Sequence, residues 1–286
     1  DSLREIDVDP DDIVAPMLSG PDPFGYRHYA KQVFGLERGK VILGSYVAGT
    51  HEVVNNAGCP VLATPLSQLM GRLLEEVRGR RLRIARGDEC GLRYAVARMS
   101  RHNSEMVLTL VTSDERPEHY KDDLEPLARE LSEIVPKLRG VVVVCNTDPG
   151  NVLLRGEKTE LCGDPVLTER MLGYDHLVGP TSFFQINPQT AQSLFETAVK
   201  FAGNGTSCLE LFCGVGAMTL PLAERFERVV GIDVSEESVE HLLETARRHD
   251  ISNIEAVPGD AEEQARACLD NLRPRVCVVD PPRRGM

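Results

Sequence analysis

The chain has 286 residues, of which 42% are hydrophobic and 27% are charged, with a formal net charge of −12. The length suits two ordinary domains, and the composition is that of a folded globular protein. The acidic balance argues against nucleic-acid binding by the whole surface, since phosphates require local positive potential. No apolar run approaches the ~20 residues that cross a bilayer, and the start has no signal-peptide pattern. We expect a cytoplasmic protein that does not insert in a membrane, and we expect a monomer.

Residues 1–20 are acidic and proline-rich, which predicts a terminal stub. Residues 21–179 mix β-branched strand candidates with two stretches of helical period, at residues 66–77 and 124–134. The strand candidates are residues 40–47, 92–99, 106–112 and 140–145. This pattern predicts an α+β domain.

One stretch of this domain departs from the acidic average. Eight arginines lie between Arg78 and Arg101, against only two acidic residues. The stretch could face RNA, or it could be a solvated strand and hairpin face, and charge alone leaves both interpretations open.

The pattern changes after Gly179-Pro180, where strands and helices begin to alternate regularly. After a first helix at 188–201, strands at 207–212, 228–233, 253–257 and 276–280 alternate with helices at 217–226, 236–249 and 261–272. Right-handed crossovers between such strands give a parallel sheet with helices on both faces. Residues 180–286 are therefore predicted to be an α/β domain with a Rossmann-like, doubly wound sheet.

Residues at the predicted strand ends point to an adenosine-type ligand. The first strand runs into a glycine-rich turn, Phe212 to Ala217, and the second ends in Asp233, which could bind two ribose hydroxyls. A dinucleotide site would need a third glycine where this chain has Thr219. Asp233 could also simply end its strand.

Two further aspartates follow the next strands. Asp260 could accept a hydrogen bond from an adenine amino group, or it could equally be a helix N-cap. Asp280 precedes two prolines, Pro281 and Pro282, which would fix its position above the ligand beside a nucleobase edge. The alternative for this sequence is a simple tight turn.

Four ordered motifs in the second half resemble the RNA uracil-C5 methyltransferase family, in its 23S ribosomal-RNA branch. They are Ser182 to Asn187, Leu211 to Gly216, Gly231 to Asp233, and Asp280 to Arg283. Segments of the first half also resemble this family, including Tyr26 to His28, Leu43 to Tyr46 and His51 to Val54, so the likeness covers residue 20 to the end.

The resemblance implies a class I methyltransferase fold that binds S-adenosyl-L-methionine, preceded by an RNA-binding α+β domain. It implies that Gln185 contacts the methionine part of the cofactor, Phe212 lines the pocket, Asp233 holds the ribose and Asp260 lies near the adenine. Asp280 would close the site beside the target uracil. Family members often have a polar residue at the position of Ala217, so a side-chain contact there is in doubt.

In this family a cysteine thiolate adds to C6 of uracil so that C5 can take the methyl group, and a base then removes the C5 proton. The resemblance places both groups after Met286, so we expect no catalytic residue in this chain. Cys213 is expected to pack beneath the cofactor turn, and Cys277 within its strand. Phe183 could pack against an extruded base or lie in the core.

The eight cysteines contain no C-x-x-C pair, so we expect most of them to be reduced and buried. Cys59 resembles one ligand of an iron–sulfur cluster in some members of the branch, but a single cysteine cannot hold a cluster. We therefore expect no metal in this chain.

The leading hypothesis is methylation of uracil C5 in RNA, with 23S ribosomal RNA as substrate. Two alternatives remain open at this stage. One is an adenine-N6 or cytosine methyltransferase, which usually has an aromatic residue at the position of Arg283. The other is an RNA-binding fragment without catalysis.

Overall fold

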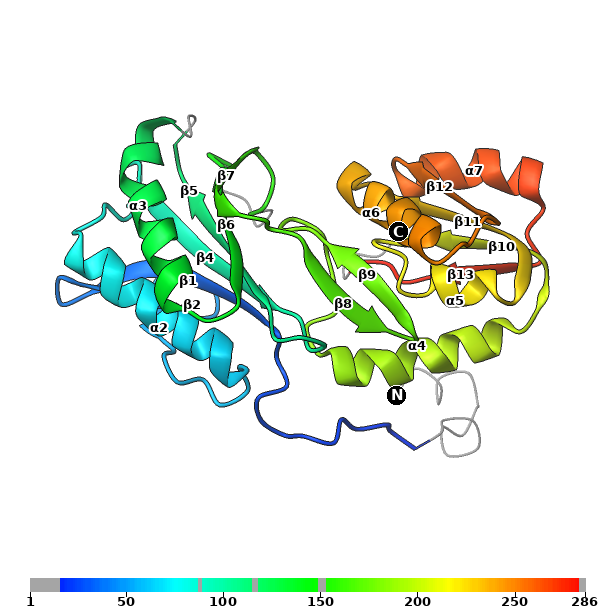
Figure 1. Ribbon diagram of the computed structural model, residues 1–286, viewed down its shortest axis with the longest axis horizontal. Coiled ribbons are helices and arrows are strands. Elements are labelled where there is room, and N and C mark those ends of the chain that lie inside the picture. Colours follow the sequence, from blue (N-terminus) through cyan, green and yellow to red (C-terminus); the bar gives the residue numbers. More distant parts are fainter. Residues whose placement is uncertain (1–15, 87–88, 115–117, 149–152, 283–286) are drawn as a thin grey trace.

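The computed structural model describes residues 16–86, 89–114, 118–148 and 153–282. They form an elongated molecule with two lobes and a β-hairpin between them, and one long helix runs beneath the hairpin and the second lobe (Figure 1). The N-terminal part of the described chain runs in an extended path along the first turn of that helix, where Gly20 lies against Thr190.

The first lobe is a seven-stranded sheet with two helices on one face (Figure 1). Its strand order is β3-β2-β1-β4-β5-β6-β7, in which β5 and β6 are parallel and every other neighbouring pair is antiparallel. The strands are β1 (Tyr29–Glu37), β2 (Lys40–Tyr46), β3 (Val53–Asn55), β4 (Leu92–Met99), β5 (Met106–Thr112), β6 (Leu138–Cys145) and β7 (Glu157–Gly163). The helices are α2 (Thr64–Gly79) and α3 (Glu118–Ile134).

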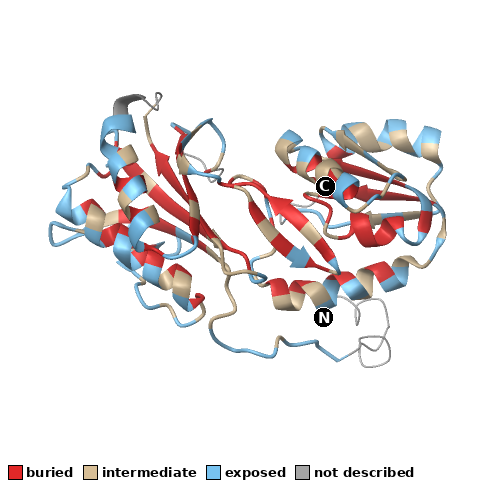
Figure 2. Cartoon of the chain, in the orientation of Figure 1, coloured by how far each residue is buried: buried red, intermediate tan, exposed pale blue. Residues whose placement is uncertain are grey.

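The lobe is held by apolar side chains at the expected periods. In α2, Leu66, Leu69, Leu73 and Val77 are fully buried on the face toward the sheet. All seven residues of β5 are buried, as Figure 2 shows for the central strands. Such continuous burial means that this sheet is covered on both faces at its centre.

The β-hairpin between the lobes joins their cores. Its strands are β8 (Leu167–Met171) and β9 (Tyr174–Val178). Leu167, Met171 and Val178 pack in the core of the second lobe, and Val107 of β5 reaches the same cluster. The expected domain boundary at residue 179 assigns this hairpin to the first domain, whereas its apolar side chains pack with residues after 180.

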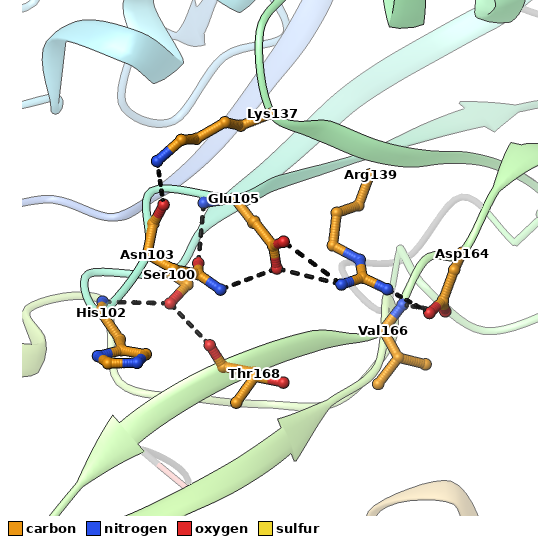
Figure 3. Close-up of polar contacts among 9 residues, drawn as sticks. All are labelled: Ser100, His102, Asn103, Glu105, Lys137, Arg139, Asp164, Val166 and Thr168. Carbon is orange, nitrogen blue, oxygen red and sulfur yellow. Dashed lines mark hydrogen bonds and ion pairs between the residues drawn. The ribbon is translucent and has the colours of Figure 1, made fainter.

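Polar contacts fix the hairpin to the turn between β4 and β5 (Figure 3). The Ser100 hydroxyl donates to the Thr168 carbonyl at 2.8 Å and accepts the His102 N–H at 3.2 Å. Beside them, Arg139 forms ion pairs with Glu105 and with Asp164. Asp164 lies just before the first strand of the hairpin. The hairpin is therefore held by polar contacts with the first lobe and by both apolar packing and hydrogen bonds with the second, where the His176 ring contacts the Val215 carbonyl and the Leu177 N–H donates to the Thr245 hydroxyl.

The second lobe contains the predicted parallel sheet, in the order β12-β11-β10-β13. Its elements are α4 (Pro188–Ala202), β10 (Gly205–Leu211), α5 (Thr219–Ala223), β11 (Phe226–Asp233), α6 (Glu236–Arg248), β12 (Ile254–Pro258), α7 (Ala261–Leu272) and β13 (Val276–Val279). Alternate residues of β10 face opposite sides, with Cys208 toward α4 and Leu209 toward α7. The sheet is thus covered by helices on both faces, which confirms the predicted α/β fold class.

Some predicted elements were wrong in detail. The helix expected at 217–226 is only Thr219–Ala223, because Gly214 and Gly216 have φ values of 53° and 86° that hold the preceding residues in a turn. Three of the eight cysteines are buried rather than most, and Cys277 is exposed because β13 is the edge strand of the described sheet.

The structure also changes the interpretation of three arginines in the arginine-rich stretch. Arg98 is half-buried and donates to the Ser182 and Phe184 carbonyls, and Arg93 donates to the backbone carbonyls of Asn146 and Asp148 at 2.7 and 2.9 Å, so neither belongs to a solvated face. Arg78 donates to the Val41 carbonyl. These side chains hold backbone segments in place.

A carboxyl group lies inside the second sheet. Glu210 of β10 is 1% exposed, and its Oε2 accepts the Thr219 hydroxyl at 2.6 Å, which ties the strand to α5. Burial, together with the nearby charges of Asp280 and Asp233, raises the pKa of Glu210 to about 8. The folded chain therefore keeps this proton at pH values where the unfolded chain has released it.

We predict that this carboxyl makes the fold less stable as the pH rises. Between the ordinary carboxyl pKa and about 8, the folded state binds more protons, so stability falls with increasing pH at about 1.4 kcal/mol per unit. Glu210→Gln keeps the shape and removes the titration. Denaturation at pH 5.5 and 7.5 should show the variant gaining about 2 kcal/mol on the native chain. Parallel pH curves for the two proteins would show that the folded carboxyl is already ionised.

Candidate functional site

The candidate site begins at the turn that follows β10. Phe212 has φ 62°, in the left-handed region that side chains with a Cβ rarely adopt, and Gly214 and Gly216 are also left-handed. Left-handed residues other than glycine carry backbone strain that is often found at functional sites. At Gly216 a Cβ would lie 2.2 Å from the Leu242 side chain, so this turn also depends on glycine for space.

Asp233 closes this turn from the neighbouring strand. Its Oδ2 accepts the Gly214 N–H at 2.9 Å and its Oδ1 accepts the Ser235 N–H at 2.9 Å. Its backbone carbonyl accepts the Gly259 N–H after β12, so the carboxyl ends of three strands are tied together. Each carboxylate oxygen has a second lone pair that a ligand hydroxyl could use.

Gln185 and Asp280 meet on the other side of the turn. The Gln185 amide Nε2 donates to Asp280 Oδ2 at 3.4 Å, although the two residues are 95 positions apart. Both line one cavity together with Phe183, Glu210, Phe212 and Gly214. Three of the five predicted cofactor residues, Gln185, Phe212 and Asp280, therefore lie around a single pocket.

The other two predicted residues lie beside this pocket rather than among the residues that line it. Asp233 reaches it through its bond to Gly214. Asp260 is the N-cap of α7, since its Oδ1 accepts the N–H groups of Glu262 and Glu263 at 2.9 and 3.3 Å. The adenine contact of Asp260 stays a prediction.

Two residues at or beside the site were missed from the sequence: Glu210 lines the pocket, and Val234 lies next to Asp233 outside the pocket lining. Glu210 was passed over although an acid between apolar neighbours in a strand is an unusual choice, because a buried charge is costly. Val234 follows Asp233 and is 75% exposed, so an apolar side chain faces outward beside the carboxylate. The signal available in the sequence for Val234 was its position directly after Asp233, the acidic residue that ends β11.

The structure shows where the Phe183 and Cys213 side chains lie. Phe183 is 66% exposed, so it does not lie in the core. The Cys213 side chain is buried among Tyr174, Leu220 and Leu242, and burial raises its thiol pKa well above the ordinary value. Cys213 therefore packs as an apolar group and stays a thiol.

Cys59 packs against the core of the first lobe. Within the described ranges, no three His, Cys, Asp or Glu side chains gather as a metal-binding group. None of the described helices is both long and apolar enough to span a membrane.

Known proteins resemble this chain in sequence and in fold. An RNA methyltransferase of Thermosynechococcus vestitus, described as uncharacterized, is 32% identical over 94% of this chain and 59% of its own length. One from a Nostoc species is 29% identical over 95% of this chain and 59% of its own. The chain thus spans about three fifths of the length of these relatives.

A solved structure, the Pyrococcus abyssi tRNA (uracil-54, C5)-methyltransferase in complex with S-adenosyl-L-homocysteine, matches with a TM-score of 0.66. The likeness covers 84% of this chain and 57% of that one at 21% identity, which shows a common fold. Residues 50–286 match the family described as tRNA (uracil-5-)-methyltransferase. The match covers the whole pocket and the first lobe from residue 50 onward, and this chain belongs to that family.

Proposed function

We propose that this chain forms the cofactor-binding and RNA-binding parts of an enzyme that methylates C5 of uracil in RNA, with 23S ribosomal RNA as the substrate and S-adenosyl-L-methionine as the cofactor. One observation carries the proposal: Gln185, Phe212 and Asp280, taken from three separate segments, line one pocket that Asp233 closes. Membership of the family supports the reaction.

Groups in and beside the pocket are suited to an adenosine cofactor. Asp233 offers one free lone pair on each carboxylate oxygen to the ribose hydroxyls, and Val234 offers an exposed apolar surface to the adenine ring. Gln185 would bind the methionine part, and Asp260 would lie near the adenine edge. When bound, S-adenosyl-L-methionine supplies a methyl group on a positively charged sulfur.

The residues around the pocket are suited to orient a base. Phe183 presents an exposed ring at the mouth of the pocket, where an extruded uracil could stack on it. Asp280 precedes Pro281 and Pro282, which restrict its backbone, and it accepts the Gln185 amide. The residue that distinguished uracil from amino-group chemistry in the sequence, Arg283, lies outside the described residues.

We predict that Asp233→Asn weakens S-adenosylhomocysteine binding by about tenfold or more, because the amide loses a charged acceptor for the ribose hydroxyls. Isothermal titration calorimetry on the chain measures this. Asp164→Asn is the control, since Asp164 pairs with Arg139 in the first lobe. Absence of binding heat with the native chain would refute the proposed cofactor.

We predict that Phe183→Ala lowers affinity for uridine-containing single-stranded RNA about tenfold and leaves S-adenosylhomocysteine affinity unchanged, because it removes a stacking surface. Phe201→Ala is a matched control, as Phe201 is an equally apolar ring that is 87% exposed on α4. Fluorescence anisotropy with a labelled RNA reports the change. The same loss in both variants would mean that exposed rings bind RNA without regard to the pocket.

The substrate is tested with the full-length protein. Transcripts of 23S ribosomal RNA domains and of tRNA are incubated with it and digested, and 5-methyluridine is measured by mass spectrometry. We predict methylation of the ribosomal transcripts. Methylation of tRNA alone would overturn the choice of RNA, and N6-methyladenosine or a methylated cytidine would overturn the choice of base.

A further inference from the structure

A half-buried arginine of the first lobe holds the segment that carries Phe183 and Gln185. Arg98 is in β4, and its Nη2 donates to the Ser182 carbonyl at 2.9 Å while its Nη1 donates to the Phe184 carbonyl at 3.3 Å. Its guanidinium lies 4.9 Å from the centre of the Tyr29 ring. One planar group therefore grips two alternate peptide units of a segment 84 residues away.

The grip decides where the intervening side chains point. Ser182 and Phe184 are 1% and 5% exposed and face inward, whereas Phe183 is 66% exposed. Gln185 follows the second held carbonyl and reaches Asp280 in the pocket. Because consecutive side chains of an extended segment alternate in direction, fixing the carbonyls on both sides of Phe183 fixes the directions of Phe183 and Gln185.

The backbone of this segment is tied largely to the first lobe. The His28 N–H donates to the Ile186 carbonyl at 2.9 Å, next to the Arg98 bonds. On the side of the second lobe, the Ser238 hydroxyl meets the Ser182 hydroxyl at 3.3 Å. The first lobe thus determines the path of residues 182–186 along the pocket of the second.

Partial burial of the charged Arg98 side chain costs desolvation free energy. Its pKa falls to about 10, chiefly because burial disfavours the charged form, so it remains a cation at neutral pH. The nearby carboxylate of Glu169 accepts the backbone N–H groups of Arg101 and Arg170, which leaves the Arg98 donors to the carbonyls. A lysine there could not bind both carbonyls in one plane.

We propose that Arg98 is a positioning residue: by holding the Ser182 and Phe184 carbonyls it sets Gln185 against the cofactor and Phe183 against the base, although it contacts neither ligand. The inference rests on the proposed function of the pocket. It makes cofactor affinity depend on a side chain of the first lobe.

The test compares Arg98→Lys with Arg93→Lys in the 286-residue chain. Arg93 is a matched control, since it also lies in β4 and also donates to two backbone carbonyls, those of Asn146 and Asp148, away from the pocket. We expect S-adenosylhomocysteine affinity, measured by calorimetry, to fall about tenfold in Arg98→Lys and to stay at the native value in Arg93→Lys. Native affinity in Arg98→Lys overturns the proposal.

A double-mutant cycle with Gln185→Ala separates positioning from general damage. If Arg98 acts through Gln185, the double variant binds S-adenosylhomocysteine about as weakly as the weaker single variant. If the two losses multiply, Arg98 acts elsewhere and the proposal fails.

Hydrogen exchange gives a readout that needs no ligand. We expect the amides of residues 182–186 to exchange faster in Arg98→Lys than in the native chain or in Arg93→Lys, at equal thermal midpoints. Unchanged exchange in this segment would contradict the inference, whether or not the native chain binds S-adenosylhomocysteine. Failure of the native chain to bind S-adenosylhomocysteine would by itself count against the proposed cofactor only.

Discussion

The hydrogen bond from the Gly214 N–H to the Asp233 carboxylate is the contact on which the site depends. It joins the left-handed turn after β10 to the end of β11, and parallel pairing ensures that both strand ends lie at the same edge of the sheet. Phe212, with its strained left-handed backbone, lies two positions before Gly214. The hydrogen bond that Gly214 donates therefore holds the end of the turn that contains Phe212. The strand ends that carry Phe212, Asp233 and Asp280 lie at this edge, and residues 182–186 are held beside it from the first lobe.

The lobes are joined in a way that a boundary in the sequence does not describe. The β8–β9 hairpin packs with the second core through Leu167 and Met171 and is hydrogen-bonded to the first lobe through Thr168 and Glu169. One strand of the hairpin therefore contacts both lobes. The same division occurs in residues 182–186, whose backbone is held by the first lobe and whose side chains line the pocket of the second.

The sequence predicted the second lobe well, because strands and helices of regular period alternate there and glycines mark the turn. Strands 92–99 and 106–112 were also predicted with the observed bounds. The hairpin was missed because its buried residues include Glu169 and His176, polar groups that hide an apolar period. Glu210 and Arg98 were missed for a related reason: local charge suggests solvent, and only long-range packing shows that Glu210 is buried and that Arg98 is half-buried against residues 182–184.

Val107 gives the molecule a property of a different kind. It belongs to a central strand of the first sheet, yet its side chain packs with Leu167 and Phe184 in the core of the second lobe. Opening either core exposes this side chain, so its packing links the stability of the two lobes. A substitution deep in the first lobe can therefore shorten the lifetime of the pocket, and selection on that distant packing would act as selection on the site.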